Sequence, residues 1–129
     1  MHFGYTIVYV PDVGEAVDFY ERAFGFACHF RGEEGDYAEL DSGSTVLAFA
    51  ANHMAEHFGF SIVPNRADQP APGIELAFVT EDVLAGFKQA TEAGATAVTD
   101  PHQTPWGQTV SYVRDLNGVL VEICSPIDV

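Results

Sequence analysis

Basic side chains are scarce in this sequence of 129 residues. Five Lys and Arg stand against nineteen Asp and Glu, which gives a formal net charge of -14. A surface of that sign repels phosphate backbones and anionic lipid headgroups, so we expect neither a nucleic acid nor a membrane as a partner. It attracts cationic small molecules, although acidic charge also keeps many proteins soluble without any such role.

Cysteines and long apolar segments are also scarce. Cys28 and Cys124 are far apart, lie in apolar contexts and form no C-x-x-C motif, so we interpret them as reduced core residues. No apolar run is long enough to span a bilayer, and the N-terminal "MHFGYTIVYVP" lacks the basic segment and cleavage site of a signal peptide. These features favour a cytoplasmic protein.

Several catalytic motifs are missing as well. The sequence contains no serine nucleophile elbow, no phosphate-binding loop and no dinucleotide fingerprint. What it does contain is typical of a globular domain, with 47% hydrophobic and 19% charged residues in a length that suits one domain.

The two halves of the chain repeat one order of elements. The first copy has predicted strands at 5–10, 26–30, 35–40 and 44–50, and the second has them at 74–79, 96–100, 109–115 and 118–124. In each copy a helix follows the first strand, running from Asp12 to Gly25 and from Asp82 to Gly94. Aligning Asp12 with Asp82 places Tyr5 on Glu75, which indicates an internal duplication of a βαβββ module.

The segments "YVPDVGEAVDFYERAFGF" and "PWGQTVSYVRDLNGVLVEICSP", in this repeated context, resemble the vicinal oxygen chelate superfamily. That superfamily includes glyoxalase I, fosfomycin resistance enzymes, extradiol dioxygenases, methylmalonyl-CoA epimerase and bleomycin resistance proteins. The resemblance implies an α+β fold in which two tandem βαβββ modules form a cup-like curved sheet. The repeat divides one domain, 1–129, into module one at 1–51, a linker at 52–73 and module two at 74–129. The resemblance also implies a homodimer.

The resemblance also implies where a metal would bind. Carried over by position, the ligand sites of the superfamily's enzymes fall on Tyr5, on Leu47 or Ala48, on Glu75 and on Glu122. Transition metals prefer imidazole in such sites, so two carboxylates and a phenol are a poor set of donors. We therefore expect no tightly bound metal; a divalent ion such as Mg²⁺ or Mn²⁺, if one binds, would use Glu122 and Glu75.

Glu122 stands out because it interrupts the apolar strand "VLVEIC". A carboxylate is costly to bury unless it is paired, protonated or bound to something. If Glu75 faces the same space, the two carboxylates repel and the pKa of one should rise, which would create a catalytic acid or base. The alternative is that one or both carboxylates pair with Arg114 or with backbone donors.

The remaining candidate residues would bind a ligand. Trp106, in the turn "PWGQ", could stack on a flat molecule or simply pack at one end of the sheet, and Gln108 could donate a hydrogen bond or lie in solvent. Aromatic residues on strands could line the cup or belong to the core. The full set of candidates for ligand binding is Trp106, Gln108, Phe49, Tyr37, Tyr112, His102 and Tyr5.

Two functions fit these observations. The first is binding of a small aromatic or cationic molecule in the cup without a tightly bound metal, as in the bleomycin resistance branch. The second is a metal-dependent lyase, isomerase or dioxygenase of the glyoxalase type, in which the metal polarises a substrate oxygen. Metal-free acid–base chemistry by Glu122 and Glu75 is a third alternative. The shortage of metal ligands favours binding.

Overall fold

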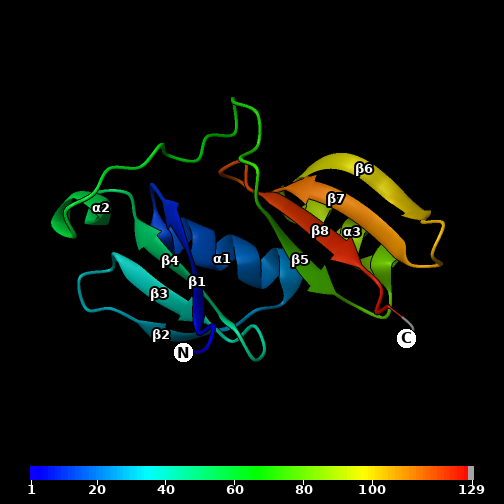
Figure 1. Cartoon of the computed structure of the whole chain (residues 1–129), viewed down its shortest axis with the longest axis horizontal. Helices are drawn as coiled ribbons and strands as arrows, with labels where there is room; N and C mark the ends of the chain where they lie inside the picture. Colours follow the sequence, from blue (N-terminus) through cyan, green and yellow to red (C-terminus); the bar gives the residue numbers. More distant parts are fainter. Residues whose placement is uncertain (128–129) are drawn as a thin grey trace. The chain divides into compact units, whose positions relative to one another are not determined.

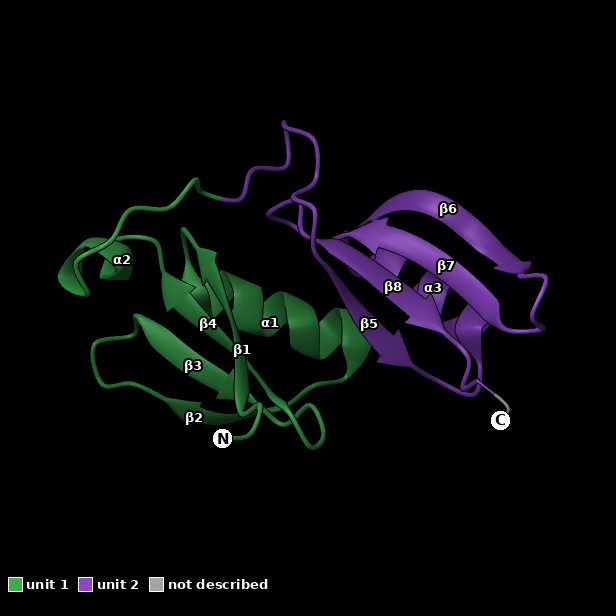
Figure 2. Cartoon of the chain, in the orientation of Figure 1, with its two compact units in different colours: residues 1–64 green, residues 65–129 purple. Residues whose placement is uncertain are grey.

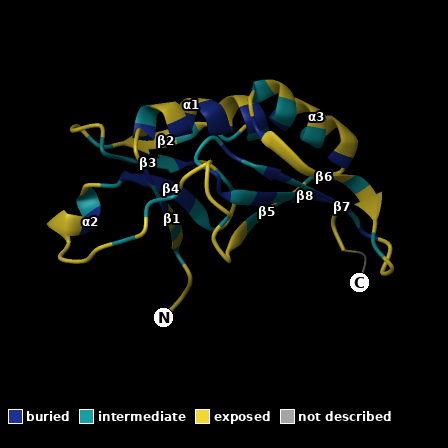
Figure 3. Cartoon of the chain, turned by 90° about the horizontal axis from the view of Figure 1, so that it is seen from above, coloured by how far each residue is buried: buried dark blue, intermediate teal, exposed yellow. Residues whose placement is uncertain are grey.

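The repeated order of elements is present in the structure, a computed structural model that describes residues 1–127. The chain divides into two units, Met1–Pro64 and Asn65–Val129 (Figure 2). Each unit has one four-stranded sheet with a helix lying along one of its faces (Figures 1 and 3). This confirms the α+β class and the two tandem βαβββ modules.

Unit 1 pairs its first strand with its last. The sheet order is β1-β4-β3-β2, with β1 parallel to β4 and the other neighbours antiparallel. Its elements are β1 (Tyr5–Val10), α1 (Val13–Phe24), β2 (Cys28–Arg31), β3 (Tyr37–Leu40), β4 (Val46–Ala51) and the short α2 (Met54–His57).

Unit 2 repeats this topology in the order β5-β8-β7-β6. Its elements are β5 (Glu75–Val79), α3 (Val83–Ala93), β6 (Thr96–Gln103), β7 (Thr109–Arg114) and β8 (Leu120–Cys124). Strand β6 continues beyond the predicted 96–100 and includes Pro101. Proline is tolerated there because β6 lies at the edge of the sheet, where not every N–H needs a ladder partner.

The helix ends follow the predicted capping residues. The Asp12 side chain accepts a hydrogen bond of 3.0 Å from the Glu15 N–H, and Gly25 ends α1 in the left-handed conformation with a φ of 77°. Asp82 accepts from Ala85 in the same way, and Gly94 ends α3. These local contacts fix where each helix begins and ends.

Each helix buries one face against its own sheet. In unit 1, Tyr20 of α1 packs against Phe49 of β4 with ring centroids 4.8 Å apart. In unit 2, α3 approaches β8 closely at Gly86, where a Cβ atom would lie 3.2 Å from Cγ2 of Ile123. A glycine inside a helix lowers helix stability, and this close approach explains its presence. It also shows that Ile123 points toward the helix.

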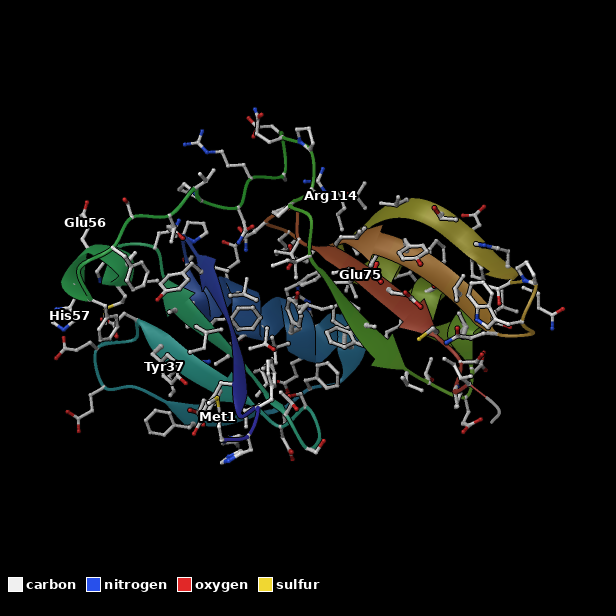
Figure 4. The ribbon with its side chains drawn as sticks, in the orientation of Figure 1. Met1, Tyr37, Glu56, His57, Glu75 and Arg114 are labelled. Atoms are coloured by element: carbon white, nitrogen blue, oxygen red, sulfur yellow. The ribbon has the colours of Figure 1, made fainter. Side chains whose placement is uncertain are left out.

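The predicted linker is divided between the units. Residues 52–64 belong to unit 1, where Phe60 packs edge-to-face on Tyr9 at 6.0 Å. Residues from Asn65 onward belong to unit 2, where the Arg114 guanidinium donates to the carbonyls of residues 66, 67 and 69 (Figure 4). Most of the segment is thus held by one unit or the other.

The two cysteines differ in burial. Cys124 is buried, but Cys28 is only half-buried, so the interpretation of both as core residues holds for Cys124 alone.

Among the helices of residues 1–127, none combines the length and the apolar character that crossing a bilayer requires.

Candidate functional site

The sheet of unit 2 has one face against α3 and one open face. Side chains alternate along β8, so Val121 and Ile123 lie on the helix side and Glu122 and Cys124 lie on the open side. The strand register places Glu122 opposite Tyr112 of β7 and Ala77 of β5. The carboxylate that interrupts the apolar strand therefore points away from the core.

Glu75, Glu122 and Tyr112 form one cluster on this open face. Glu75 begins β5, the strand next to β8 (Figure 4). It lies two residues before Ala77, the residue opposite Glu122, and so on the same face. The two glutamates are within hydrogen-bonding reach of each other, and the Tyr112 hydroxyl donates to Glu122 Oε1 at 3.1 Å. The predicted convergence of Glu75 and Glu122 on one space is confirmed.

The cluster shifts the acidities of three groups. Desolvation, followed by the hydrogen bond and the charge of Glu122, raises the pKa of Glu75 above that of an ordinary glutamate. The same causes, in the same order, raise the pKa of Tyr112 to about 12 and the pKa of the buried Cys124 thiol to about 11. Near neutrality, Tyr112 and Cys124 therefore keep their protons, and Glu75 holds its proton more tightly than a solvated carboxyl does.

The raised pKa of Glu75 should make folding stability depend on pH. A carboxyl whose pKa is higher in the folded protein favours folding while it is protonated, and that contribution disappears as the pH rises through the folded pKa. We expect the urea midpoint of the wild type to fall by more than that of Glu75→Gln as the pH rises above the ordinary glutamate pKa. The exposed Glu81→Gln serves as the control and should retain the wild-type pH dependence. Equal pH dependence of wild type and Glu75→Gln would contradict the raised pKa of Glu75 and its close approach to Glu122.

Arg114 does not neutralise this cluster. Its Nε atom donates to the Gly118 carbonyl at 2.9 Å, and its terminal nitrogens donate to the carbonyls of residues 66, 67 and 69. Within residues 65–127, no lysine or arginine forms an ion pair with Glu75 or Glu122. The alternative in which Arg114 pairs with these glutamates is therefore wrong, and the two carboxyls are left without a cation in their own unit.

Trp106 and Gln108 are joined at one end of the same sheet. The Trp106 indole N–H donates to Gln108 Oε1 at 2.9 Å, while Gln108 Nε2 donates to the Ser125 carbonyl at 2.9 Å. Gln108 is buried, whereas Trp106 is 67% exposed. The Gln108 amide thus holds the exposed indole and ties it to Ser125, the residue that follows β8. Trp106 is not a core residue, and the ligand-stacking role stays a prediction.

His102 also belongs to this sheet. It lies on β6 opposite Val110, whose other partner across the sheet is Cys124, one step beyond the row that contains Tyr112 and Glu122. The imidazole is exposed, and its Nδ1 atom lies 3.0 Å from the Asp100 carbonyl oxygen. It is therefore near the cluster in register but makes no hydrogen bond to it.

The other three candidates lie in unit 1. Tyr5 and Tyr37 occupy the open face of that sheet, but Phe49 lies on the helix side, fully buried against Tyr20. The position of Phe49 is that of a core residue, and it does not share a face with Tyr37. The strand register also settles the ambiguity at the fourth strand. The offset that places Tyr5 on Glu75 also places Ile7 of β1 on Ala77 of β5. Ile7 pairs with Ala48 and Ala77 pairs with Glu122, so Ala48 is the counterpart of Glu122.

These positions do not fit the metal site that the resemblance implies. Ala48 offers no donor atom, Tyr5 offers a neutral phenol, and Glu75 and Glu122 are close enough to compete for a proton. Within each unit, the described residues contain no group of three or more His, Cys, Asp and Glu side chains that could hold a metal ion.

The sequence interpretation missed two residues next to Tyr37. The Tyr37 hydroxyl donates to Glu39 Oε2 at 2.7 Å, and His29 Nε2 lies 3.1 Å from Glu39 Oε1. Glu39 carries the signal that singled out Glu122, because it is an acidic residue between two apolar strand residues, Ala38 and Leu40, which are fully buried. The same pattern could have identified it.

Comparisons with known structures identify the same fold. A glyoxalase-related enzyme from Fulvimarina pelagi superimposes with a TM-score of 0.83 at 20% sequence identity, covering 98% of this chain and 88% of that one. A glyoxalase/bleomycin resistance protein/dioxygenase family enzyme from Burkholderia phytofirmans PsJN gives 0.79 at 20% identity, with coverages of 97% and 98%. TioX from Micromonospora sp. ML1 gives 0.73 at 25% identity, with coverages of 97% and 98%.

A search of the curated proteins found no match. The family model described as the Glyoxalase/Bleomycin resistance protein/Dioxygenase superfamily matches residues 2–123, which is nearly the whole chain. The duplicated modules, their strand order and this match agree: the chain belongs to the Glyoxalase/Bleomycin resistance protein/Dioxygenase superfamily.

Proposed function

We propose that this protein binds a small cationic aromatic molecule on the open face of the unit 2 sheet, without a tightly held metal. The observation that carries the proposal is the cluster of Glu75 and Glu122, to which Tyr112 donates and which has no lysine or arginine partner in its own unit. A ligand ammonium or guanidinium would supply the missing positive charge and donate hydrogen bonds to the carboxylate oxygens.

Three features support this choice of ligand. Glu122 and Tyr112 are half-buried, so a charge pair with Glu122 is less screened than one in bulk solvent, while Glu75 beside them is exposed. Trp106 offers an exposed aromatic ring at the end of the same sheet, suited to a flat ligand or to a cation. The strongly acidic chain, with a net charge of -14, would also speed the encounter with a cation.

Fluorescence of the single tryptophan tests the proposal directly. Titration with a panel of cationic aromatic compounds should quench or shift Trp106 emission with saturation, and neutral analogues of the same shape should bind more weakly. Elemental analysis of protein purified without a chelator or a metal-affinity column should find less than stoichiometric Zn, Ni, Fe or Mn. A stoichiometric metal that is lost on Glu122→Gln would instead support a metal-dependent lyase, isomerase or dioxygenase.

Metal-free proton transfer is the second candidate, because one observation favours it. Glu75 has a raised pKa beside a second carboxyl, an arrangement that suits a general acid or base. Incubation of each bound compound in D₂O, followed by mass spectrometry, would distinguish the two functions. Deuterium incorporation that is lost in Glu75→Gln indicates chemistry, and unchanged compound indicates binding alone.

A further inference from the structure

Arg114 lies on the open face of the unit 2 sheet, beside the cluster of Glu75 and Glu122. It follows Tyr112 by two residues along β7, so the two side chains are on the same face. The strand register places Arg114 opposite Leu120, and Leu120 opposite Glu75. Glu122 is then the diagonal neighbour of Arg114 on β8, and diagonal neighbours are roughly 7–8 Å apart, a distance that a long side chain spans. The position of Arg114 is therefore within reach of the Glu122 carboxylate.

Backbone carbonyls hold the guanidinium in another direction. Arg114 Nη2 donates to the Gln69 carbonyl at 2.6 Å and to the Arg66 carbonyl at 3.2 Å, and Nη1 donates to the Ala67 carbonyl at 3.4 Å (Figure 4). A carboxylate would offer the guanidinium a bidentate pair of opposite charge, which neutral carbonyls do not. The carbonyls of residues 66–69 are thus what keeps this arginine away from the cluster.

Residues 66–69 form a strap that is attached to unit 2 mainly through Arg114. All four strap side chains are exposed, so the strap buries little apolar surface. A turn shapes it, in which the Gln69 N–H donates to the Arg66 carbonyl at 3.4 Å, and the Arg66 carbonyl also lies close to Gly118. A surface segment that is held by hydrogen bonds and few apolar contacts opens at a lower free energy than the core of its domain.

We propose that the strap is a switch for the site around Glu122. While it is docked, as in this structure, Arg114 stays on the strap carbonyls and the two glutamates are left to a ligand cation. When the strap is released, the guanidinium pairs with Glu122 and takes the place of that cation. Strap docking and cation binding therefore favour each other, because each is lost when Arg114 moves to the carboxylates. The switch rests on the proposed function and adds a means of regulating the same site.

Arg114→Lys and Arg114→Gln separate the strap from the positive charge. Both lose the planar fork that binds several carbonyls at once, but only lysine keeps a cation that can reach Glu122. Trypsin measures strap release through cleavage after Arg66, which should be about tenfold faster or more in both variants than in the wild type. Cleavage after Lys88, within α3, reports unfolding of unit 2 and should stay at the wild-type rate.

Binding of benzylammonium chloride, followed by the amide chemical shifts of residues 109–124, tests the competition. Arg114→Lys should weaken binding by about tenfold, because the released cation lowers the fraction of protein whose site is open. Arg114→Gln should bind as tightly as the wild type or more tightly, although its strap is also released. A merely structural role for Arg114 would instead weaken binding in both variants.

Each part of the switch can fail by itself. Equal binding by the wild type and Arg114→Lys would overturn the switch and leave the proposed function intact, as would weaker binding by Arg114→Gln. Unchanged cleavage after Arg66 in both variants would mean that Arg114 does not hold the strap, which also overturns the switch. If the wild type does not bind benzylammonium, the proposed function fails and the switch fails with it.

Gly118→Ala replaces the Arg114 variants if faster cleavage after Lys88 shows that they unfold. A Cβ atom at Gly118 would lie 2.5 Å from the Arg66 carbonyl oxygen, so it pushes the strap away while Arg114 keeps its charge. This variant should be cleaved faster after Arg66 and should bind benzylammonium more weakly than Gly107→Ala, where a Cβ atom has open space. Equal binding by the two glycine variants would refute the switch.

Discussion

Replacement of Glu122 by glutamine should weaken binding of a cationic aromatic ligand by roughly 1.5–3 kcal/mol, the range for hydrogen bonds to charged groups, or about ten- to a hundredfold in Kd. The amide keeps the size of the side chain and still accepts the Tyr112 hydroxyl, but it loses the negative charge. Trp106 fluorescence titration of both proteins measures the difference. The urea midpoint should stay the same or increase, because one of two neighbouring carboxylates is removed.

The control for this substitution is Glu81→Gln. Glu81 is exposed in the same unit, so its replacement changes the net charge equally without touching the cluster. A general electrostatic attraction would weaken in both variants to the same small extent, and that weakening would vanish in high salt. Equal binding by wild type and Glu122→Gln, or loss of the fold in Glu122→Gln, would mean that Glu122 has a structural role and would refute the proposed site.

The substitution Gly118→Ala should lower the free energy of unfolding by about 2–4 kcal/mol, from the left-handed backbone and the steric overlap together. Gly118 has a φ of 85°, and a Cβ atom there would lie 2.5 Å from both Arg114 Nη2 and the Arg66 carbonyl oxygen. The methyl group would therefore push apart the contacts between Arg114 and residues 66–69 that hold this segment to unit 2.

Gly107→Ala is a closely matched control for Gly118→Ala. Gly107 lies in the same unit with a φ of 86°, but no atom other than its chain neighbours lies within 4 Å of the Cβ position. It should show only the backbone cost of about 1–2 kcal/mol. Urea unfolding of the wild type and the two variants measures both losses of unfolding free energy. If Gly118→Ala loses no more than Gly107→Ala, residues 66–69 can move away from the added methyl group without destabilising the fold.

The sequence was sufficient for features that depend on near neighbours or on the repeat. Asp12 and Gly25 mark the ends of α1 because a capping hydrogen bond spans three residues and a left-handed turn suits glycine, so both signals are local. The duplication predicted a common topology, and with it the adjacency of Glu75 and Glu122 on neighbouring strands. A polar residue in an apolar strand identified the open face of β8.

Tertiary structure decided how the strands register and which groups each polar side chain meets. Only the pairing of β1 with β4 shows that Ala48, and not Leu47, is the counterpart of Glu122. Arg114 could have paired with a carboxylate, but it binds carbonyls of a segment more than forty residues earlier. The bulge that brings His29 to Glu39 depends on how β2 meets β3. A shift of one residue in a strand reverses the face of every side chain, and that shift is set by contacts between distant segments rather than by local sequence.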